Sequence, residues 1–435
     1  MILIKGLEKN KGFILLKGGR LYEPFLSIDK KNDILIKDDV IVKINKSIKE
    51  EKNYKVINCD NNIITNGFLD LHVHFREPGF EFKETIKTGS ISAFYGGFTR
   101  VCTMPNTDPV IDSPELIKFI IEESQDTPVY IHPIGAITKG QKGLEISEIG
   151  EMVEAGAVAI SDDGIPVKNS QVLRFALEYA KKFNIPVINH AEDNCLVNDG
   201  LMHEGKMSTK LGLPGNPDIA ESSMVYRDLA ISEYVGGRLH VPHVSSFKSL
   251  EIIKIFRDKG VDVTAEVTPH HLSLTDSILR NYDTNAKVAP PIRSSKDQKA
   301  LIDAIKSGLI DCIATDHAPH ANEDKDRDFK HASCGMIGLE SAFGIVNKTL
   351  AAEKVDITDI IDLFTVKPSR VMNIIPNVIK EGNIAEINII DPVCKWIFDQ
   401  NSIKSKSNNS ALLDREMFGK VLYSMNKGYI LNCKV

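Results

Sequence analysis

The sequence predicts an α/β protein in which a (β/α)8 barrel of the TIM type carries a small composite β-sandwich domain. Two observations lead to this prediction. Between residues 67 and 375, short apolar stretches alternate with helix-like stretches, which is typical of parallel strands joined by helical crossovers. The two ends of the chain instead contain short apolar runs separated by Gly, Asn and Asp, a pattern typical of strands joined by turns.

The middle region contains eight candidate strands, the number that a barrel of this type needs. They are residues 68–74, 99–104, 129–134, 157–161, 187–190, 239–243, 261–267 and 311–315. Candidate helices between them include residues 113–123, 170–183, 219–235 and 296–308. A doubly wound open sheet is the alternative. Because no GxGxxG or Walker A run follows any of these strands, that alternative has no nucleotide-binding signature.

The strand patterns at the two ends resemble each other. Apolar runs occur at 13–16, 34–36 and 40–42, residues 382–390 alternate like a strand, and residues 421–430 suggest another strand. We therefore expect residues 1–66 and 376–435 to pair into one composite β-domain, and residues 67–375 to form the barrel.

Composition narrows the class of protein. The 435 residues carry a formal net charge of -6, which argues against a nucleic-acid or membrane partner. The seven cysteines are odd in number and form no CxxC pair, so neither a disulfide framework nor a cysteine zinc site is indicated. The first residues contain no secretory h-region, and no apolar run approaches the length of a membrane span. We expect a reduced, cytoplasmic protein.

The stretch Asp70–Arg76 indicates the start of a metal site. His72 and His74 are two residues apart at the end of an apolar run, so on a strand they point to the same side. Arg76 has the same parity, and its guanidinium is suited to holding a substrate carboxylate. A pair of partly buried structural histidines is the alternative interpretation of this stretch alone.

Polar residues recur at the ends of the other candidate strands. Runs of this kind are Asn106–Thr107, Ser161–Gly164, Asn189–Asp193, His243–Ser245 and Thr315–His320. In a (β/α)8 barrel these ends meet at one face, where the active site lies. Imidazoles and carboxylates together suit zinc, and a pair of divalent ions can activate water for attack on an amide while a nearby carboxylate moves the proton.

These motifs resemble those of the bacterial type I dihydroorotases in the amidohydrolase superfamily. The resemblance rests on Asp70–Gly79, Asn189–Asn194, His243–Ser245, Ala265–His271 and Thr315–His320. It implies two zinc ions per subunit and assigns the metal ligands, which are His72, His74, Asp163, His190, His243 and Asp316. Asp316 also matches the catalytic general base and acid.

The resemblance implies further roles at strand 4 and on the substrate side. Many superfamily members bridge their metals with a carboxylated lysine, but this chain has Ser161-Asp162-Asp163-Gly164 at that position. Asp163, and not Asp162, matches the bridging position by its spacing to His190. The expected substrate-binding residues are His74, Phe75, Arg76, Asn106, Ala289, His320, Cys334 and Gly335. Ala289 and Cys334 depart from the residues common in the family, which are Asn and Phe.

The expected reaction is the reversible hydrolysis of (S)-dihydroorotate to N-carbamoyl-L-aspartate in pyrimidine biosynthesis. One alternative is an allantoinase or a hydantoinase (dihydropyrimidinase) of the same fold. Another is a non-catalytic relative that assembles with aspartate transcarbamoylase, although such relatives lose metal ligands that this chain keeps. A homodimer or an association with aspartate transcarbamoylase is left open as the assembly. His240 is expected to face away from His243 and to lie in the core.

Overall fold

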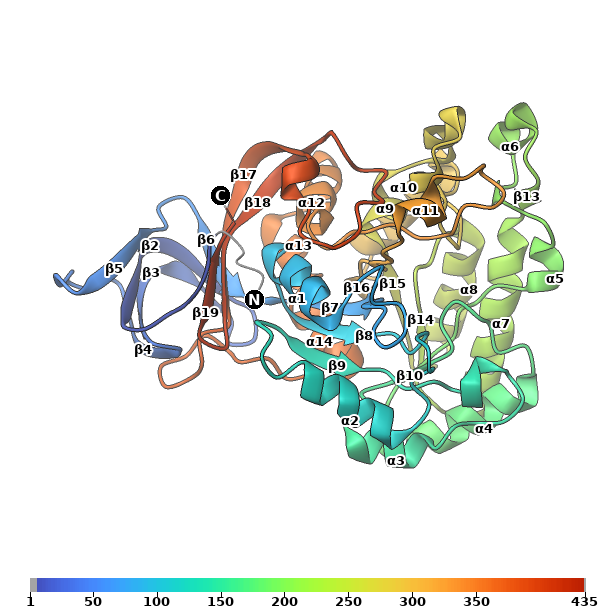
Figure 1. The fold of residues 1–435 in the computed structure, drawn as a ribbon, viewed down its shortest axis with the longest axis horizontal. Helices are drawn as coiled ribbons and strands as arrows, with labels where there is room; N and C mark the ends of the chain where they lie inside the picture. Colours follow the sequence, from blue (N-terminus) through green and yellow to red (C-terminus); the bar gives the residue numbers. More distant parts are fainter. Residues whose placement is uncertain (1–5, 434–435) are drawn as a thin grey trace.

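Strands from both ends of the chain form one nine-stranded sheet in this structure, a computed structural model that describes residues 6–433 (Figure 1). β17 pairs antiparallel with β6, with Ile387 opposite Asn66, and β6 runs parallel to β2. The strands are β1 (Leu7–Lys9), β2 (Phe13–Glu23), β3 (Ile28–Lys37), β4 (Val40–Asn45), β5 (Tyr54–Asn58), β6 (Ile63–Asn66), β17 (Ile387–Phe398), β18 (Arg415–Asn426) and β19 (Tyr429–Asn432). The two ends therefore pair as expected, while the domain boundaries after residues 66 and 375 stay a prediction.

An apolar face holds this sheet together. Ile14 and Leu16 on β2, Ile34 on β3 and Ile389 on β17 are buried in one cluster, because alternate side chains of a strand point to the same face. The expected strand at 421–430 is instead the end of β18, a turn and the start of β19. Lys427 and Gly428 in that turn both have positive φ angles, so the chain reverses there.

The middle of the chain contributes eight parallel strands among the described residues. They form a group β7-β8-β9 and a group β10-β11-β14-β15-β16. Parallel bridges join the groups at both seams, Val73 with His317 and Gly135 with Ile160. The strands are β7 (Phe68–Val73), β8 (Phe98–Thr103), β9 (Tyr130–Pro133), β10 (Ile160–Ser161), β11 (Val187–Ile188), β14 (Leu239–Val241), β15 (Val263–Val267) and β16 (Cys312–Ile313). Every predicted stretch overlaps one of them, with β8 beginning one residue before its predicted stretch. Several strands end early because the chain turns where the polar residues begin.

Helices follow most of these strands and pack around them (Figure 1). The longer ones are α1 (Ile86–Tyr95), α2 (Pro114–Glu123), α3 (Ile149–Ala155), α4 (Ser170–Ala180), α7 (Asp218–Val235), α8 (Phe247–Asp258), α10 (Ser295–Lys306), α12 (Ala342–Ala352), α13 (Ile357–Asp362) and α14 (Val366–Met372). α10 shows why they form: Ser294 and Asp297 make a capping box, and Leu301 and Ile305 face the core. Short elements in the connections are α5 (Asn194–Val197), β12 (Met202–His203), α6 (Lys206–Leu211), β13 (Gly215–Asn216), α9 (Pro269–Ser273) and α11 (Asn322–Lys325).

A buried ion pair fastens the parallel strands to the nine-stranded sheet. Arg100 on β8 donates from Nε and Nη2 to the two carboxylate oxygens of Glu386, at 2.8 and 2.9 Å. Thr99 Oγ1 donates to the same carboxylate at 2.7 Å. Paired and hydrogen-bonded charges of this kind are tolerated in a core. Across residues 6–433, every helix is too short or too polar to cross a membrane.

Candidate metal centre and substrate site

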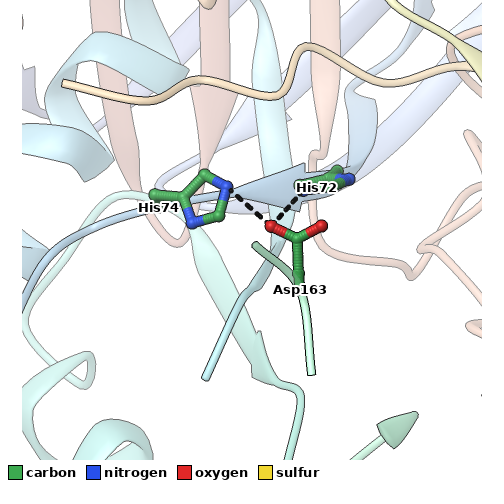
Figure 2. Close-up of side chains that lie close together, drawn as sticks. All are labelled: His72, His74 and Asp163. Atoms are coloured by element: carbon green, nitrogen blue, oxygen red, sulfur yellow. Dashed lines mark ion pairs between the residues drawn. The ribbon is translucent and has the colours of Figure 1, made fainter. Parts of the chain in front are cut away.

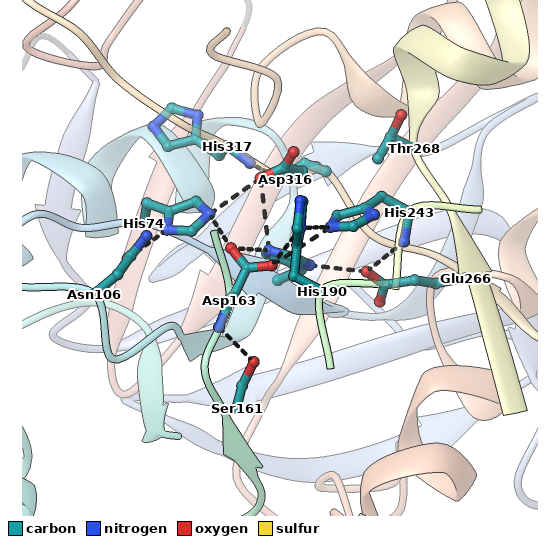
Figure 3. Close-up of polar contacts among 12 residues, drawn as sticks. His74, Asn106, Ser161, Asp163, His190, His243, Glu266, Thr268, Asp316 and His317 are labelled. Carbon is teal, nitrogen blue, oxygen red and sulfur yellow. Dashed lines mark hydrogen bonds and ion pairs between the residues drawn. The ribbon is translucent and has the colours of Figure 1, made fainter. Parts of the chain in front are cut away.

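All six predicted ligands converge at the carboxyl ends of the parallel strands (Figures 2 and 3). The parallel arrangement brings these ends to one edge, although the residues are far apart in sequence. All six side chains are buried. His72 lies on β7 and His74 just beyond it, Asp163 follows β10, His190 follows β11, His243 follows β14 and Asp316 follows β16.

Asp163 stands between two pairs of histidines. Its Oδ2 atom lies 3.4 Å from Nε2 of both His72 and His74 (Figure 2). Its Oδ1 atom lies 3.4 Å from Nε2 of His243 and 3.6 Å from Nδ1 of His190. Each oxygen of the one carboxylate therefore faces a different pair.

Asp316 faces the first pair. Its Oδ1 atom lies 3.1 Å from Nε2 of His74 and 3.5 Å from Nε2 of His72. In the second pair, Nδ1 of His190 and Nε2 of His243 are 3.1 Å apart. The first half of the centre thus holds two imidazoles and a carboxylate of its own, and the second holds two imidazoles.

The donor set fits divalent cations. Nε2 of His72 is buried and has no hydrogen-bond partner among the described residues. The ligand atoms of His72, His74 and Asp163 lie within 4.8 Å of one another, as do those of Asp163, His190 and His243. Imidazole nitrogens and carboxylate oxygens are common ligands of zinc and other divalent metals. A buried nitrogen that makes no hydrogen bond within residues 6–433 and faces two carboxylates, at 3.4 and 3.5 Å, is well placed to bind a metal ion.

The electrostatics of the cluster favour positive charge. Burial opposes ionisation of Asp163, but the charge of His72 and hydrogen bonds from His190 and His243 hold its pKa well below the ordinary value. Burial also disfavours a charged His190, yet contacts with Asp163 and Glu192 raise its pKa to about 10. Such a site takes up protons or metal ions, which compete for the same imidazole nitrogens.

Three site residues have backbone conformations that are unusual for non-glycine residues. The φ angles are +61° at Arg76, +34° at His243 and +48° at Asp316. Each lies just beyond a strand end, where the chain turns sharply and aims a side chain into the centre. Left-handed conformations of this kind cost about 1–3 kcal/mol each and cluster at functional sites.

The geometry separates Asp163 from its neighbour. Asp162 accepts hydrogen bonds from the backbone N–H groups of Ile137 and Thr138, at 2.8 and 3.0 Å, and from the Thr138 hydroxyl. It therefore fastens the loop after β9 and does not face the histidines. Lys168 is exposed, and the ligand-atom clusters contain no lysine among the described residues.

The predicted substrate residues border the centre on the side of Arg76. The Arg76 guanidinium donates to the carbonyl of Pro319 at 3.2 Å and lies 3.5 Å from Nε2 of His320. His320 Nε2 in turn donates to the carbonyl of Cys334 at 2.8 Å. Asn106 accepts from His74 Nδ1 at 2.8 Å, which leaves its amide N–H2 group for a substrate. Ala289 precedes a cis peptide bond to Pro290 and is half-buried.

Two predicted substrate residues are constrained by their own contacts. The Phe75 ring is buried and packs where a side chain at Gly89 would collide with it, so only its backbone is left for a substrate contact. Gly335 donates its N–H to the carbonyl of Lys287 at 2.9 Å, and its carbonyl accepts from Lys325 at 2.9 Å. Both backbone groups of Gly335 are therefore engaged within the chain.

Comparison with known proteins agrees with this geometry. The chain is 42% identical over 419 residues to a curated dihydroorotase of Citrifermentans bemidjiense, covering 96% of this chain and 99% of that protein. It is 43% identical over 420 residues to the dihydroorotase of Acetivibrio thermocellus, with 96% and 98% covered. The chain belongs to the dihydroorotase family. A sequence model described as "Dihydro-orotase-like" also matches residues 61–249. The resemblance and the hydrolase class predicted from the sequence are confirmed.

Solved structures show that this dihydroorotase family member shares its fold with other cyclic amide hydrolases. An L-hydantoinase from Arthrobacter aurescens superimposes with a TM-score of 0.84 at 23% identity, covering 96% of this chain and 95% of that one. A dihydropyrimidinase from Brevibacillus agri gives 0.81 at 19% identity, with 96% and 94% covered. At these identities the likeness concerns the fold alone.

Several residues near the centre have no counterpart in the sequence predictions. Glu266 contacts His72, and Glu192 faces His190. Lys83 lies 3.4 Å from Nδ1 of His320, which adds a second cation beside the predicted carboxylate site. The motifs that contain Glu266 and Glu192 were visible, but nothing in the sequence indicated their partners. His240 is buried as predicted.

Proposed function

We propose that this chain catalyses the reversible hydrolysis of the cyclic amide of (S)-dihydroorotate to N-carbamoyl-L-aspartate, with two zinc ions held by the six predicted ligands. The observation that carries the proposal is the position of Asp163, whose two oxygens face two different histidine pairs at 3.4–3.6 Å. His72, His74 and Asp316 would hold one ion, and His190 and His243 the other. Bound divalent ions would polarise the ring carbonyl and lower the pKa of water.

Asp316 is the proposed proton carrier. It lies at the open side of the first histidine pair and is buried, so its carboxylate is close to any water held there. It would accept the proton from the attacking water and deliver it to the ring nitrogen as the amide bond breaks. In the reverse direction the same carboxylate would take the proton back.

Arg76, His320 and Asn106 are proposed to bind the substrate carboxylate and so fix the orientation of the ring. Arg76 is held by Pro319, and burial lowers its pKa only to about 10, so it stays charged at neutral pH. A guanidinium with one side held by the protein can present its other N–H groups to a carboxylate. Orientation of this kind contributes to rate by holding the reacting carbonyl in place.

The two alternative functions are less well supported. A hydantoinase or allantoinase acts on a ring without this carboxylate, and the half-buried guanidinium of Arg76 favours an anionic substrate. Lys83, which is also half-buried, lies beside it and is paired with Asp324 at 3.0 Å. A non-catalytic partner of aspartate transcarbamoylase would not need the two clusters of imidazole and carboxylate groups that lie together here, with Asp316 beside one of them. Neither alternative explains the cations beside the centre.

The proposal is tested by measuring the hydrolysis of dihydroorotate and the reverse ring closure of N-carbamoyl-L-aspartate. Both reactions are followed by the absorbance of the ring amide. Purified protein should contain divalent metal, lose activity on prolonged chelation, and regain it with zinc. Hydantoin and allantoin are the comparison substrates. Hydrolysis of either neutral ring in preference to dihydroorotate, or full activity after complete metal removal, would refute the proposal.

The finer features of fold and assembly are part of the same proposal. The eight parallel strands and the two bridging seams support closure into a (β/α)8 barrel, with the nine-stranded sheet as a composite β-sandwich domain. A cytoplasmic location, and assembly as a homodimer or with aspartate transcarbamoylase, stay predictions. Sedimentation of the chain alone and mixed with the transcarbamoylase tests the assembly.

A further inference from the structure

A buried carboxylate supports the first half of the centre from behind. Glu266 on β15 is 1% exposed, and its Oε1 atom lies 2.9 Å from Nδ1 of His72. Because a carboxylate accepts, His72 carries its proton on Nδ1, and the lone pair of Nε2 points into the centre. This contact fixes both the tautomer and the ring orientation of a ligand.

Glu266 is itself held in place by a second histidine. Nε2 of His240 donates to the other carboxylate oxygen of Glu266 at 3.1 Å, and Nδ1 of His240 lies 2.8 Å from the hydroxyl of Thr264. Both oxygens of Glu266 are therefore occupied, each by a different imidazole. Thr264, His240, Glu266 and His72 form one continuous chain of hydrogen bonds that ends at the ligand atom.

A different carboxylate stands behind the second half of the centre. Glu192 follows β11, and its Oε2 atom lies 3.6 Å from Nε2 of His190. Its other oxygen accepts from the side-chain amide of Asn216 at 2.7 Å. Nδ1 of His190 is the atom that faces Asp163, so Glu192 stands on the side of the ring away from the centre.

We propose that Glu266 and Glu192 are positioning residues for separate halves of the centre, so that each controls the affinity for one metal ion. This inference rests on the proposed two-metal function. It follows from the contacts with the ligand rings, because Glu266 contacts the imidazole of His72 in the first half and Glu192 that of His190 in the second. Glu266 also accepts from the backbone N–H of His243, at 3.4 Å, but does not contact the ring of that residue.

Zinc affinity of the metal-depleted enzyme, measured by competition with a chromophoric chelator, tests the proposal. Glu266→Gln and Glu192→Gln should each weaken one of two zinc equivalents by about 10–100-fold, the usual effect of losing such a partner. Glu386→Gln is the matched control, because it removes a buried carboxylate that pairs with Arg100 away from the centre. It should change thermal stability and leave both zinc affinities as in wild type.

Double substitutions identify which half each carboxylate serves. In a His74→Ala background the first half is already disabled, so adding Glu266→Gln should change the remaining affinity little, whereas adding Glu192→Gln should still weaken it. The order should reverse in a His243→Ala background, because coupling appears only between residues of one network. The absorption spectrum of cobalt-loaded enzyme should change in the single variants and not in Glu386→Gln.

If Glu266→Gln does not fold, Thr264→Val tests the same series of hydrogen bonds from the end farthest from His72. It should weaken the binding of one zinc equivalent by a smaller factor. Two unchanged zinc affinities in both glutamine variants, with wild-type zinc binding intact, would overturn this inference alone. Equal weakening of both equivalents by either variant would also overturn it. A wild-type chain that binds no divalent ion would overturn the proposed function as well.

Discussion

Replacing Lys325 by methionine should change how the stability of this protein depends on pH. Lys325 ends the short helix α11 and is 5% exposed. Its ammonium donates to the backbone carbonyls of Ser333 and Gly335, at 2.8 and 2.9 Å, and lies 3.5 Å from that of Lys287. It thereby holds the segment that presents Cys334 beside the proposed substrate site, with carbonyl oxygens as its hydrogen-bond partners.

The size of the effect follows from the pKa of the ammonium. Burial is the main cause that lowers the pKa of Lys325 from 10.5 to about 8. A difference of this size between the unfolded and folded chains corresponds to about 3 kcal/mol, since each pH unit is worth about 1.4 kcal/mol. Below pH 8 the lysine is protonated in both the folded and the unfolded chain, so the folded protein carries the full free-energy cost of burying the charge. Between about pH 8 and 10.5 the unfolded chain binds a proton that the folded chain does not, so stability rises with pH there.

The free energy of unfolding in urea, measured from pH 7 to 10 for wild type and Lys325→Met, gives the test. The difference between the two proteins removes the contribution of all other titrating groups. As the pH rises, wild type should gain up to about 3 kcal/mol of stability relative to Lys325→Met. The control is Lys330→Met, which replaces an exposed lysine of the same segment. Relative to that variant, wild type should gain no stability. We also expect a raised KM for dihydroorotate in Lys325→Met. Parallel pH profiles for wild type and Lys325→Met would refute this reasoning.

Substitutions at Asp316, Arg76 and Asp163 test the site further. Asp316→Asn should keep at least one metal ion but lose about 10²–10⁴-fold in turnover, and near-normal turnover of the metal-loaded variant would remove its catalytic role. Arg76→Lys keeps the positive charge but should still turn over dihydroorotate more slowly. Arg76→Ala should slow the hydrolysis of dihydroorotate more than that of a neutral hydantoin or dihydrouracil. Equal losses with both kinds of substrate would make Arg76 a structural residue. Asp163→Ala should lose a metal ion and turnover, while Lys168→Ala stays active and bicarbonate removal has no effect. Activity that disappears without bicarbonate and returns with it would contradict the aspartate bridge.

The strands and the polar residues at their ends could be predicted for a common physical reason. Buried parallel strands read as apolar runs, so the polar residues that follow them, such as His72, His190 and Asp316, stand out at predictable places. In a barrel of parallel strands these strand ends lie at one face, so their convergence could be predicted without knowing which strands pair. Strand ends were predicted less well, because Arg76, His243 and Asp316 turn the chain with positive φ angles that these residue types do not signal.

The supporting residues could not be predicted in the same way. Glu266 lies on an apolar strand, and its partner His72 is 194 residues away in sequence, so no local pattern reveals the contact. Lys325 lies in a charged stretch that favours an exposed, mobile loop, yet its ammonium is buried against backbone carbonyls. In both cases the tertiary fold supplies the partner, and only the fold shows that a charged residue is buried.

The charges of the centre give an independent argument for two ions. Four carboxylates contact the four histidines: Asp163, Asp316, Glu266 and Glu192. With neutral imidazoles, this buried group carries four negative charges, which is costly unless they are balanced. Two divalent cations supply the same number of positive charges, whereas one leaves half of them unbalanced. In the absence of metal, protonation of His190 offsets part of this charge, because its carboxylate neighbours raise its pKa to about 10. The two carboxylates behind the histidines would therefore contribute to the charge that holds the proposed ions as well as to the orientation of their ligands.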